Sequence, residues 1–160
     1  MSFKRRKPKL DTTSKRVQYE LAAQLNKMCK VLDKRYQINY GGCCYLAYCI
    51  AELLEKDGFN FSLVVFDDRY DMSKFTELSE LPETMMHYAI VFDDDSVNGD
   101  LINCDDDDFD YSHQSFKVSA KDIIKYYNNN PWNSQYSTAC NGLIKLFIEC
   151  TYHEFADSIH

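Results

Sequence analysis

Residues 41–58 read GGCCYLAYCIAELLEKDG, and this stretch decides the fold. Its apolar positions recur at helical spacing: Cys43, Ala47, Ile50, Leu53 and Leu54. The pattern stops at Gly58, a residue type that tolerates the left-handed backbone with which helices commonly end. The stretch therefore predicts a helix from about Cys43 to Lys56, with two thiols in its first turn.

The segments on either side of this helix predict a single α+β domain over residues 13–160. Thr13 or Ser14 is a good N-cap for a first helix that runs to about Lys34. Short β-branched and aromatic runs predict three strands of one antiparallel sheet and then a fourth strand: Phe61–Phe66, Met86–Phe92, Leu101–Cys104 and Phe109–Val118. Residues 67–85 form a long excursion between the first two strands. Two further helices are expected over Ser119–Tyr127 and Thr138–Phe155.

Length and composition place this domain in a broad class. The chain has 160 residues, of which 45% are hydrophobic, so it is long enough for one well-buried core. No apolar run approaches the roughly 18 to 20 residues that span a bilayer, and the basic start has no apolar signal region behind it. Seven cysteines, an odd number, lie in apolar segments instead of a loop-rich frame. We expect a cytoplasmic protein in a reducing compartment.

The charge of the chain is unevenly divided. Residues 1–35 carry 11 Lys and Arg against 3 Asp and Glu, whereas the remainder carries 7 against 22. Residues 1–12 are therefore predicted to form a flexible basic arm in front of an acidic body. Such an arm is a candidate contact for nucleic acid, but the acidic body would repel phosphate, so nucleic acid is not the expected partner.

The residues that carry chemistry are a cysteine and a histidine. Cys43 begins a helix, where the helix dipole and unpaired N–H groups favour a thiolate. A nucleophilic thiol also needs a base, and His87 begins the second predicted strand. Each residue also has an alternative interpretation without catalysis. Cys43 could be a small hydrophobic residue of the core, and His87 a half-buried histidine with its hydrogen bonds satisfied.

The third member of a triad follows from strand pairing. If Phe92 pairs with Asp100, then Val91 faces Leu101 and His87 faces Asp105. In an antiparallel pair, each step back along one strand is a step forward along the other, so the two residue numbers of every pair add up to the same value. We therefore expect the Asp105 carboxylate, or failing that the Asn103 amide, within about 3.5 Å of one His87 ring nitrogen. The other ring nitrogen is expected about 4 Å from the Cys43 sulfur.

Residues 37–106 resemble the transglutaminase-like and papain-like cysteine peptidases. The shared pattern is Gly-x-Cys-x-x-x-Ala at the start of an aliphatic helix, a Gly at its end, an apolar strand, a His that opens a strand and an Asp on the next one; the matching residues are Gly41, Cys43, Ala47, Gly58, His87 and Asp105. Gln37 stands where papain-like members carry the Gln of the oxyanion hole. Leu101 and Asp106 depart from the pattern, so Asn103 stays an alternative to Asp105.

The resemblance implies a papain-like fold and a cysteine-dependent acyl-transfer enzyme, a hydrolase or transferase acting on an amide in a protein or peptide. Two alternatives remain open: a scaffold of this kind that binds without turnover, and a partner- or nucleic-acid-binding protein that uses the basic arm.

No cofactor or metal is expected. Nine Asp between Asp93 and Asp110 lack the spacing of a calcium loop and are interpreted as a solvated rim. Cys140, Cys150 and His153 are interpreted as helix packing residues instead of zinc ligands, because no CxxC pair accompanies them. Cys29, Cys44 and Cys49 are expected in the core.

Overall fold

The computed structural model describes residues 10–39, 42–84, 86–92, 101–103, 111–130 and 138–159. Within these ranges the chain is an α+β protein with four α-helices and an antiparallel sheet, as the sequence predicts. Residues 1–9 of the predicted basic arm lie outside the described residues, and so do the nine Asp of the predicted acidic rim.

The first two helices have the expected bounds and caps. α1 spans Lys15–Tyr36, and the Ser14 side chain accepts a hydrogen bond from the Val17 N–H at 3.3 Å. α2 spans Cys43–Asp57 and ends at Gly58, whose φ of 88° lies in the left-handed region. A side chain at position 58 would be strained in this conformation, which explains why the helix stops at a glycine.

The sheet has four strands in the order β3-β2-β1-β4. β1 spans Phe61–Asp67, β2 His87–Phe92, β3 Leu101–Ile102 and β4 Ser112–Phe116. Val91 pairs with Leu101 and Ile90 with Ile102, which confirms the predicted register of the second and third strands. β3 is shorter than predicted, and β4 pairs with β1 at the far edge of the sheet from β3.

Two hydrophobic clusters occupy the two faces of this sheet. The larger one joins the helices to the alternate strand residues Leu63, Val65, Tyr88, Ile90 and Phe92. The smaller one consists of Val64, Phe66, Ala89 and Val91, which alternate with these and therefore point to the opposite face. Below they are called the helix-side face and the far face.

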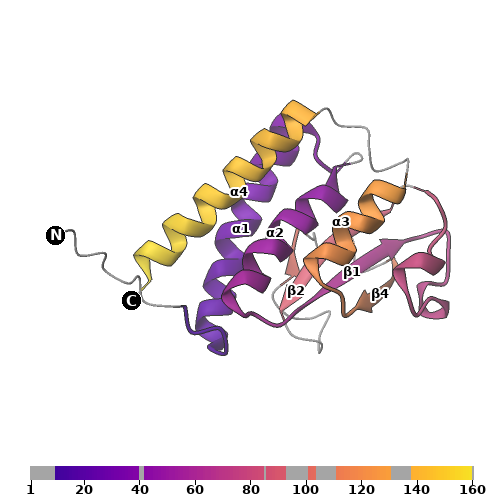
Figure 1. Cartoon of the computed structure of the whole chain (residues 1–160), viewed down its shortest axis with the longest axis horizontal. Coiled ribbons are helices and arrows are strands. Elements are labelled where there is room, and N and C mark those ends of the chain that lie inside the picture. The colour runs from indigo at the N-terminus through magenta and orange to yellow at the C-terminus, as the bar shows by residue number, and fades with distance from the viewer. Residues whose placement is uncertain are drawn as a thin grey trace.

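The helices form a layer on the helix-side face (Figure 1). α2 packs on β1 and β2, and it also contacts α3, which spans Ala120–Asn129, and α4, which spans Thr138–Ser158. α4 lies against α1 on the outside of the layer (Figure 1). The long excursion after β1 contains two short 3-10 helices, η1 over Met72–Lys74 and η2 over Leu78–Glu80.

The described part of the chain contains no helix with both the length and the apolar character that a membrane crossing requires.

Candidate active site

Cys43 is the first residue of α2, as the sequence predicts. Its N-cap is Gly42, which supplies no side chain to cap the helix, so the thiol lies beside the open first turn. The side chain is 1% exposed, and Sγ donates to the main-chain carbonyl of Met86 at 3.4 Å. A thiol has a single proton, and here that proton goes to the residue before His87.

Cys44 is a core residue. It is fully buried, and burial raises the pKa of its thiol well above the ordinary value, with a further contribution from Cys43. Burial likewise raises the pKa of Cys29 and Cys49 to about 12. All three side chains are buried in the main hydrophobic cluster, which confirms their predicted place in the core.

His87 opens β2 and is half-buried. Its Nε2 lies 2.6 Å from the main-chain oxygen of Asn103, and its ring lies 5.8 Å from the Phe66 ring. Phe66 belongs to the far face, and the next residue, Tyr88, points to the helix-side face. The His87 ring therefore lies on the face opposite α2, although its main chain adjoins the Cys43 thiol. This position does not fit the expected distance of about 4 Å between the second ring nitrogen and the Cys43 sulfur.

Asn103 contacts His87 through its main-chain oxygen, whereas the sequence led us to expect the Asp105 carboxylate or, failing that, the Asn103 side-chain amide. The amide nitrogen donates to Asn39 Oδ1 at 2.9 Å and to the Tyr88 carbonyl at 3.5 Å, and the main-chain N–H donates to Asn26 Oδ1 at 2.8 Å. Asn103 has a φ of 70°, a left-handed conformation that Asn adopts more readily than most residues. Asp105, the other candidate for the third position, lies outside the described residues.

Gln37 caps the C-terminus of α1 in the left-handed conformation, with a φ of 52°. Its main-chain N–H donates to the Asp33 carbonyl at 2.7 Å, and the residue is exposed. It precedes Asn39 by two positions, and Asn39 binds Asn103. The loop that carries the proposed oxyanion residue is thereby connected to the segment that contacts His87.

A chain of hydroxyl and amide groups that sequence reasoning missed lies beside this site. The Tyr88 and Tyr126 hydroxyls are 2.7 Å apart, and Asn130 Nδ2 donates to the Tyr126 hydroxyl at 3.3 Å. Tyr88 belongs to the same buried cluster as Cys43 and Cys44, and Tyr126 packs against that cluster. No spacing rule connects position 88 to position 126, because only the packing of α3 on α2 brings them together.

Among the described residues, no group of three or more His, Cys, Asp or Glu side chains could hold a metal ion. Of the two cysteines on α4, Cys140 is partly buried and Cys150 is exposed.

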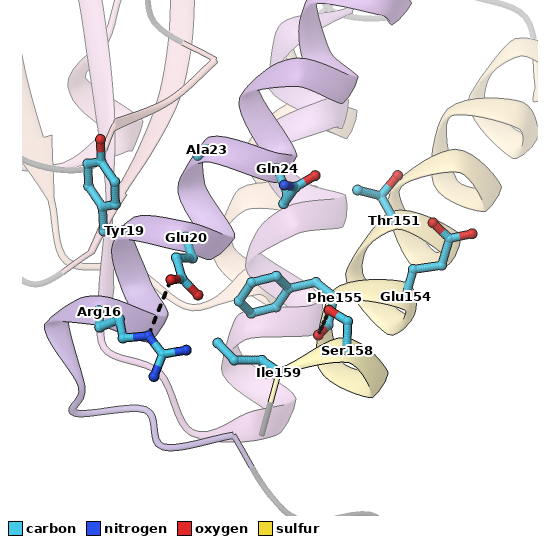
Figure 2. Close-up of a pocket in the computed structure, with 10 residues that line it drawn as sticks. All are labelled: Arg16, Tyr19, Glu20, Ala23, Gln24, Thr151, Glu154, Phe155, Ser158 and Ile159. Carbon is cyan, nitrogen blue, oxygen red and sulfur yellow. Dashed lines mark hydrogen bonds and ion pairs between the residues drawn. The ribbon is translucent and has the colours of Figure 1, made fainter.

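A separate hollow of about 610 Å³ lies between the start of α1 and the end of α4 (Figure 2). It is at the end of α1 opposite to the one that leads to Cys43. Arg16 is paired with Glu20 at 3.2 Å, and Glu154 adds a second acid to the lining. This mixed charge gives no support to phosphate binding by the first helix.

Three contacts connect the site. Cys43 binds the carbonyl of Met86, the residue before His87, and His87 contacts Asn103. Asn103 in turn binds Asn39, in the loop after Gln37. Comparison with known proteins finds no match for the chain among family models, curated proteins or solved structures.

Proposed function

We propose that this protein is a cysteine-dependent acyl-transfer enzyme with a papain-like fold, in which Cys43 is the nucleophile and His87 the base. The observation that carries the proposal is convergence: a helix N-terminus, the first residue of a strand and the end of the next strand meet in one place. Thiol enzymes need this order of elements, because the helix end favours the thiolate and the strands hold the base.

The contact with Asn103 determines which ring nitrogen of His87 carries the proton. A main-chain carbonyl only accepts hydrogen bonds, so His87 Nε2 must carry a proton to make the 2.6 Å contact. In the neutral imidazole, Nδ1 is then the basic nitrogen. In this proposal the Asn103 carbonyl holds the ring in the resting arrangement, and Asp105 is the candidate that orients the ring once it faces Cys43.

The arrangement described above is a resting one in this proposal. His87 is the first residue of β2 and makes the last pair of the β1–β2 ladder, with Phe66. Strand ends open at small cost compared with strand centres. Opening this one pair allows the His87 side chain to turn from the far face toward Cys43.

The proposed reaction follows from these groups. His87 Nδ1 takes the proton from Cys43 Sγ, and the thiolate attacks the carbonyl carbon of an amide in a protein or peptide, forming a C–S bond. The Cys43 main-chain N–H and Gln37 stabilise the oxyanion. The C–N bond breaks as His87 returns the proton to the leaving amine. Water then cleaves the thioester to a carboxylic acid and restores the thiol, or an amine takes the acyl group instead.

Alkylation by iodoacetamide near neutral pH tests the proposal. Cys43 is buried and Cys150 is exposed, so accessibility alone predicts that Cys150 is labelled first. An activated Cys43 would be labelled faster than Cys150, and H87A would slow Cys43 labelling about tenfold or more. H113A is the matched control, because the His113 ring also lies against Phe66, 5.4 Å away. Peptide mass mapping that finds Cys150 labelled and Cys43 inert overturns the proposal.

One observation favours a second candidate, a scaffold of this kind that binds without turnover. The Cys43 thiol is 1% exposed and its proton is engaged by Met86, which is the state of an unreactive buried cysteine. In this case Cys43 stays unlabelled in both the wild-type protein and H87A. The same labelling series therefore separates the two candidates.

A further inference from the structure

The first half of α4 exposes apolar side chains on its outer face. Leu143, Leu146 and Phe147 share this face at the spacing i, i+3 and i+4, and all three are exposed. Ile144 and Ile148 are buried in the core, so the packing of α4 does not depend on the exposed residues. A helix on a protein surface ordinarily carries polar residues on its outer face. This stretch of α4 therefore needs an explanation other than the fold.

Val31 of α1 extends the same surface. α1 and α4 lie side by side and run in opposite directions (Figure 1), and Gln24 and Thr151 line the hollow between them (Figure 2). About two turns farther along α1 and back along α4 are Val31 and Ile144, the neighbour of Leu143. Val31 is 58% exposed. We call Val31 and the three exposed α4 residues the apolar patch.

The apolar patch differs from the other exposed hydrophobic residues. Within the described chain, the remaining large hydrophobic residues that are exposed are tyrosines, whose hydroxyl can bind water. Aliphatic side chains and Phe have no such group, and a cluster of them at one place on a surface is typical of an interaction site.

The C-terminal half of α1 makes the border of this patch basic. Four exposed cations lie there, and we call them the basic border: Lys27, Lys30, Lys34 and Arg35. No carboxylate of the described residues forms an ion pair with any of them. The one acid between positions 27 and 35 is Asp33, which accepts from the Asn39 N–H at 2.9 Å.

The charges of α4 and α2 do not cancel this excess. Residues 138–150 contain one cation and one acid, Lys145 and Glu149. Lys145 also pairs with Glu52 of α2 at 3.4 Å. Together with residues 27–35, five cations stand against three acids around the apolar patch. The surface is thus positive in a chain whose net charge is −7.

The other half of the α1–α4 surface has the opposite sign. Residues 15–24 and 151–158 contain two cations and three acids, and Glu154 and Asp157 are exposed. A membrane or a long nucleic acid that lies along both helices would contact these acids as well, whereas a short segment need not. A second copy of the chain would bring one basic border against another, because a two-fold interface joins identical surfaces. Charge complementarity therefore favours a short acidic partner.

We propose that the apolar patch and the basic border bind a short amphipathic helix of a partner protein, one with an apolar stripe flanked by Asp and Glu. The border from Lys27 to Arg35 covers about 12 Å along α1, which corresponds to two to three turns of a partner helix. Apolar residues at i, i+3, i+4 and i+7 of that helix contact the patch, and its acids pair with the basic border. The surface uses no residue of the candidate active site, so the proposal stands whether or not Cys43 is reactive.

Titration of the full chain with a designed peptide tests the proposal. The peptide has about 14 residues, with leucines at i, i+3, i+4 and i+7 and glutamates on both flanks. It should shift the NMR resonances of the patch, and a peptide with glutamine in place of every glutamate should bind about tenfold more weakly. Added salt should weaken the binding of the glutamate peptide alone. No shift with the glutamate peptide, or equal affinity of the two peptides, overturns the proposal.

Two matched pairs of variants locate the binding surface. K30E/K34E should weaken binding about tenfold or more, whereas K121E/K125E makes the same charge change at the same spacing on α3 and should have much less effect. L146Q should weaken binding about fivefold, and Y19Q, an exposed position on the other half of α1, should not. All of these side chains are exposed, and circular dichroism checks that each variant is folded. Equal losses within either pair contradict the assignment.

Three other occupants of the surface would give different results. Ultracentrifugation that finds a dimer of the free protein, lost in L146Q, would assign the patch to a second copy. Binding to phosphatidylserine vesicles without binding to the glutamate peptide would assign it to a membrane. Peptide binding that appears only when the four Asp at positions 105–108 are changed to Asn would assign it to the acidic segment of the chain itself. Each of these results overturns the proposal.

Discussion

The helix-side face and the far face of the sheet carry the two halves of the predicted catalytic pair. The helix-side face holds the thiols of α2 and the Tyr88 hydroxyl, while the far face holds the His87 ring beside Phe66. The two faces are formed by the same strands, and adjacent residues of β2 belong to different faces. Position along the sequence therefore brings a residue to the correct end of the sheet, and strand alternation decides which side its side chain occupies.

Asn103 joins the two faces. Its carbonyl contacts His87, whose ring lies on the far face, and its amide binds Asn39 and the Tyr88 carbonyl. One residue thus couples the orientation of the histidine to the loop before Cys43.

The largest effect is expected from breaking this link. N103A removes the amide bonds, at about 1–3 kcal/mol, and places a Cβ residue without a compensating amide in the left-handed region, at roughly 1 kcal/mol more. N103G also loses the amide bonds, but glycine adopts the left-handed backbone without the steric cost that alanine has. N103G should therefore be less destabilising than N103A. Urea unfolding of both variants measures the difference. Equal loss of stability would show that the φ of 70° contributes nothing.

The next comparison sets the two faces against each other directly. Val64 and Val65 are neighbours on β1 and both are fully buried, but Val65 faces the helices and Val64 faces the far side. V65A should cost about 2–3 kcal/mol, because the large cluster cannot collapse around the lost methyl groups, and V64A about 1–2 kcal/mol. Chemical denaturation of the two variants checks this order. A larger loss for V64A would mean that the far face is the more tightly packed one.

The smallest expected effect is a pH dependence of the helix layer. The Tyr48 hydroxyl donates to Glu52 at 2.6 Å, and Lys145 of α4 lies 3.4 Å from the same carboxylate. The Tyr48 hydrogen bond, helped by Lys145, holds the pKa of Glu52 below its usual 4.5. The stabilisation is therefore fully present above pH 4.5 and is lost as the pH falls through the lower, folded value.

E52Q tests this contribution. It should lower the stability at pH 7 by only roughly a few tenths of a kcal/mol, because the pair is partly exposed, and it should flatten the acid limb of the stability profile. E154Q, on the exposed side of α4, is the control. An unchanged acid limb in E52Q would place the acid sensitivity elsewhere in the molecule.

Local signals in the sequence were sufficient for the elements themselves. The apolar period from Cys43 and the stop at Gly58 predict α2 closely, since helix bounds depend on capping residues within a few positions. The β2–β3 register was also predictable, because the two strands are near in sequence and a single offset determines every pair. For the candidate site, the sequence determined the place of Cys43 at the start of a helix and of His87 at the start of a strand.

Only the tertiary structure decided which face each strand residue occupies. Both faces of β2 are apolar, with Ala89 and Val91 on one and Tyr88 and Ile90 on the other, so the pattern contains no polar alternation that would assign His87 to a side. The edge position of β4 and the contact between Tyr88 and Tyr126 likewise depend on segments far apart in the chain. Such contacts form because burying the helix faces against one side of the sheet lowers the free energy of the whole core, which no local window of sequence records.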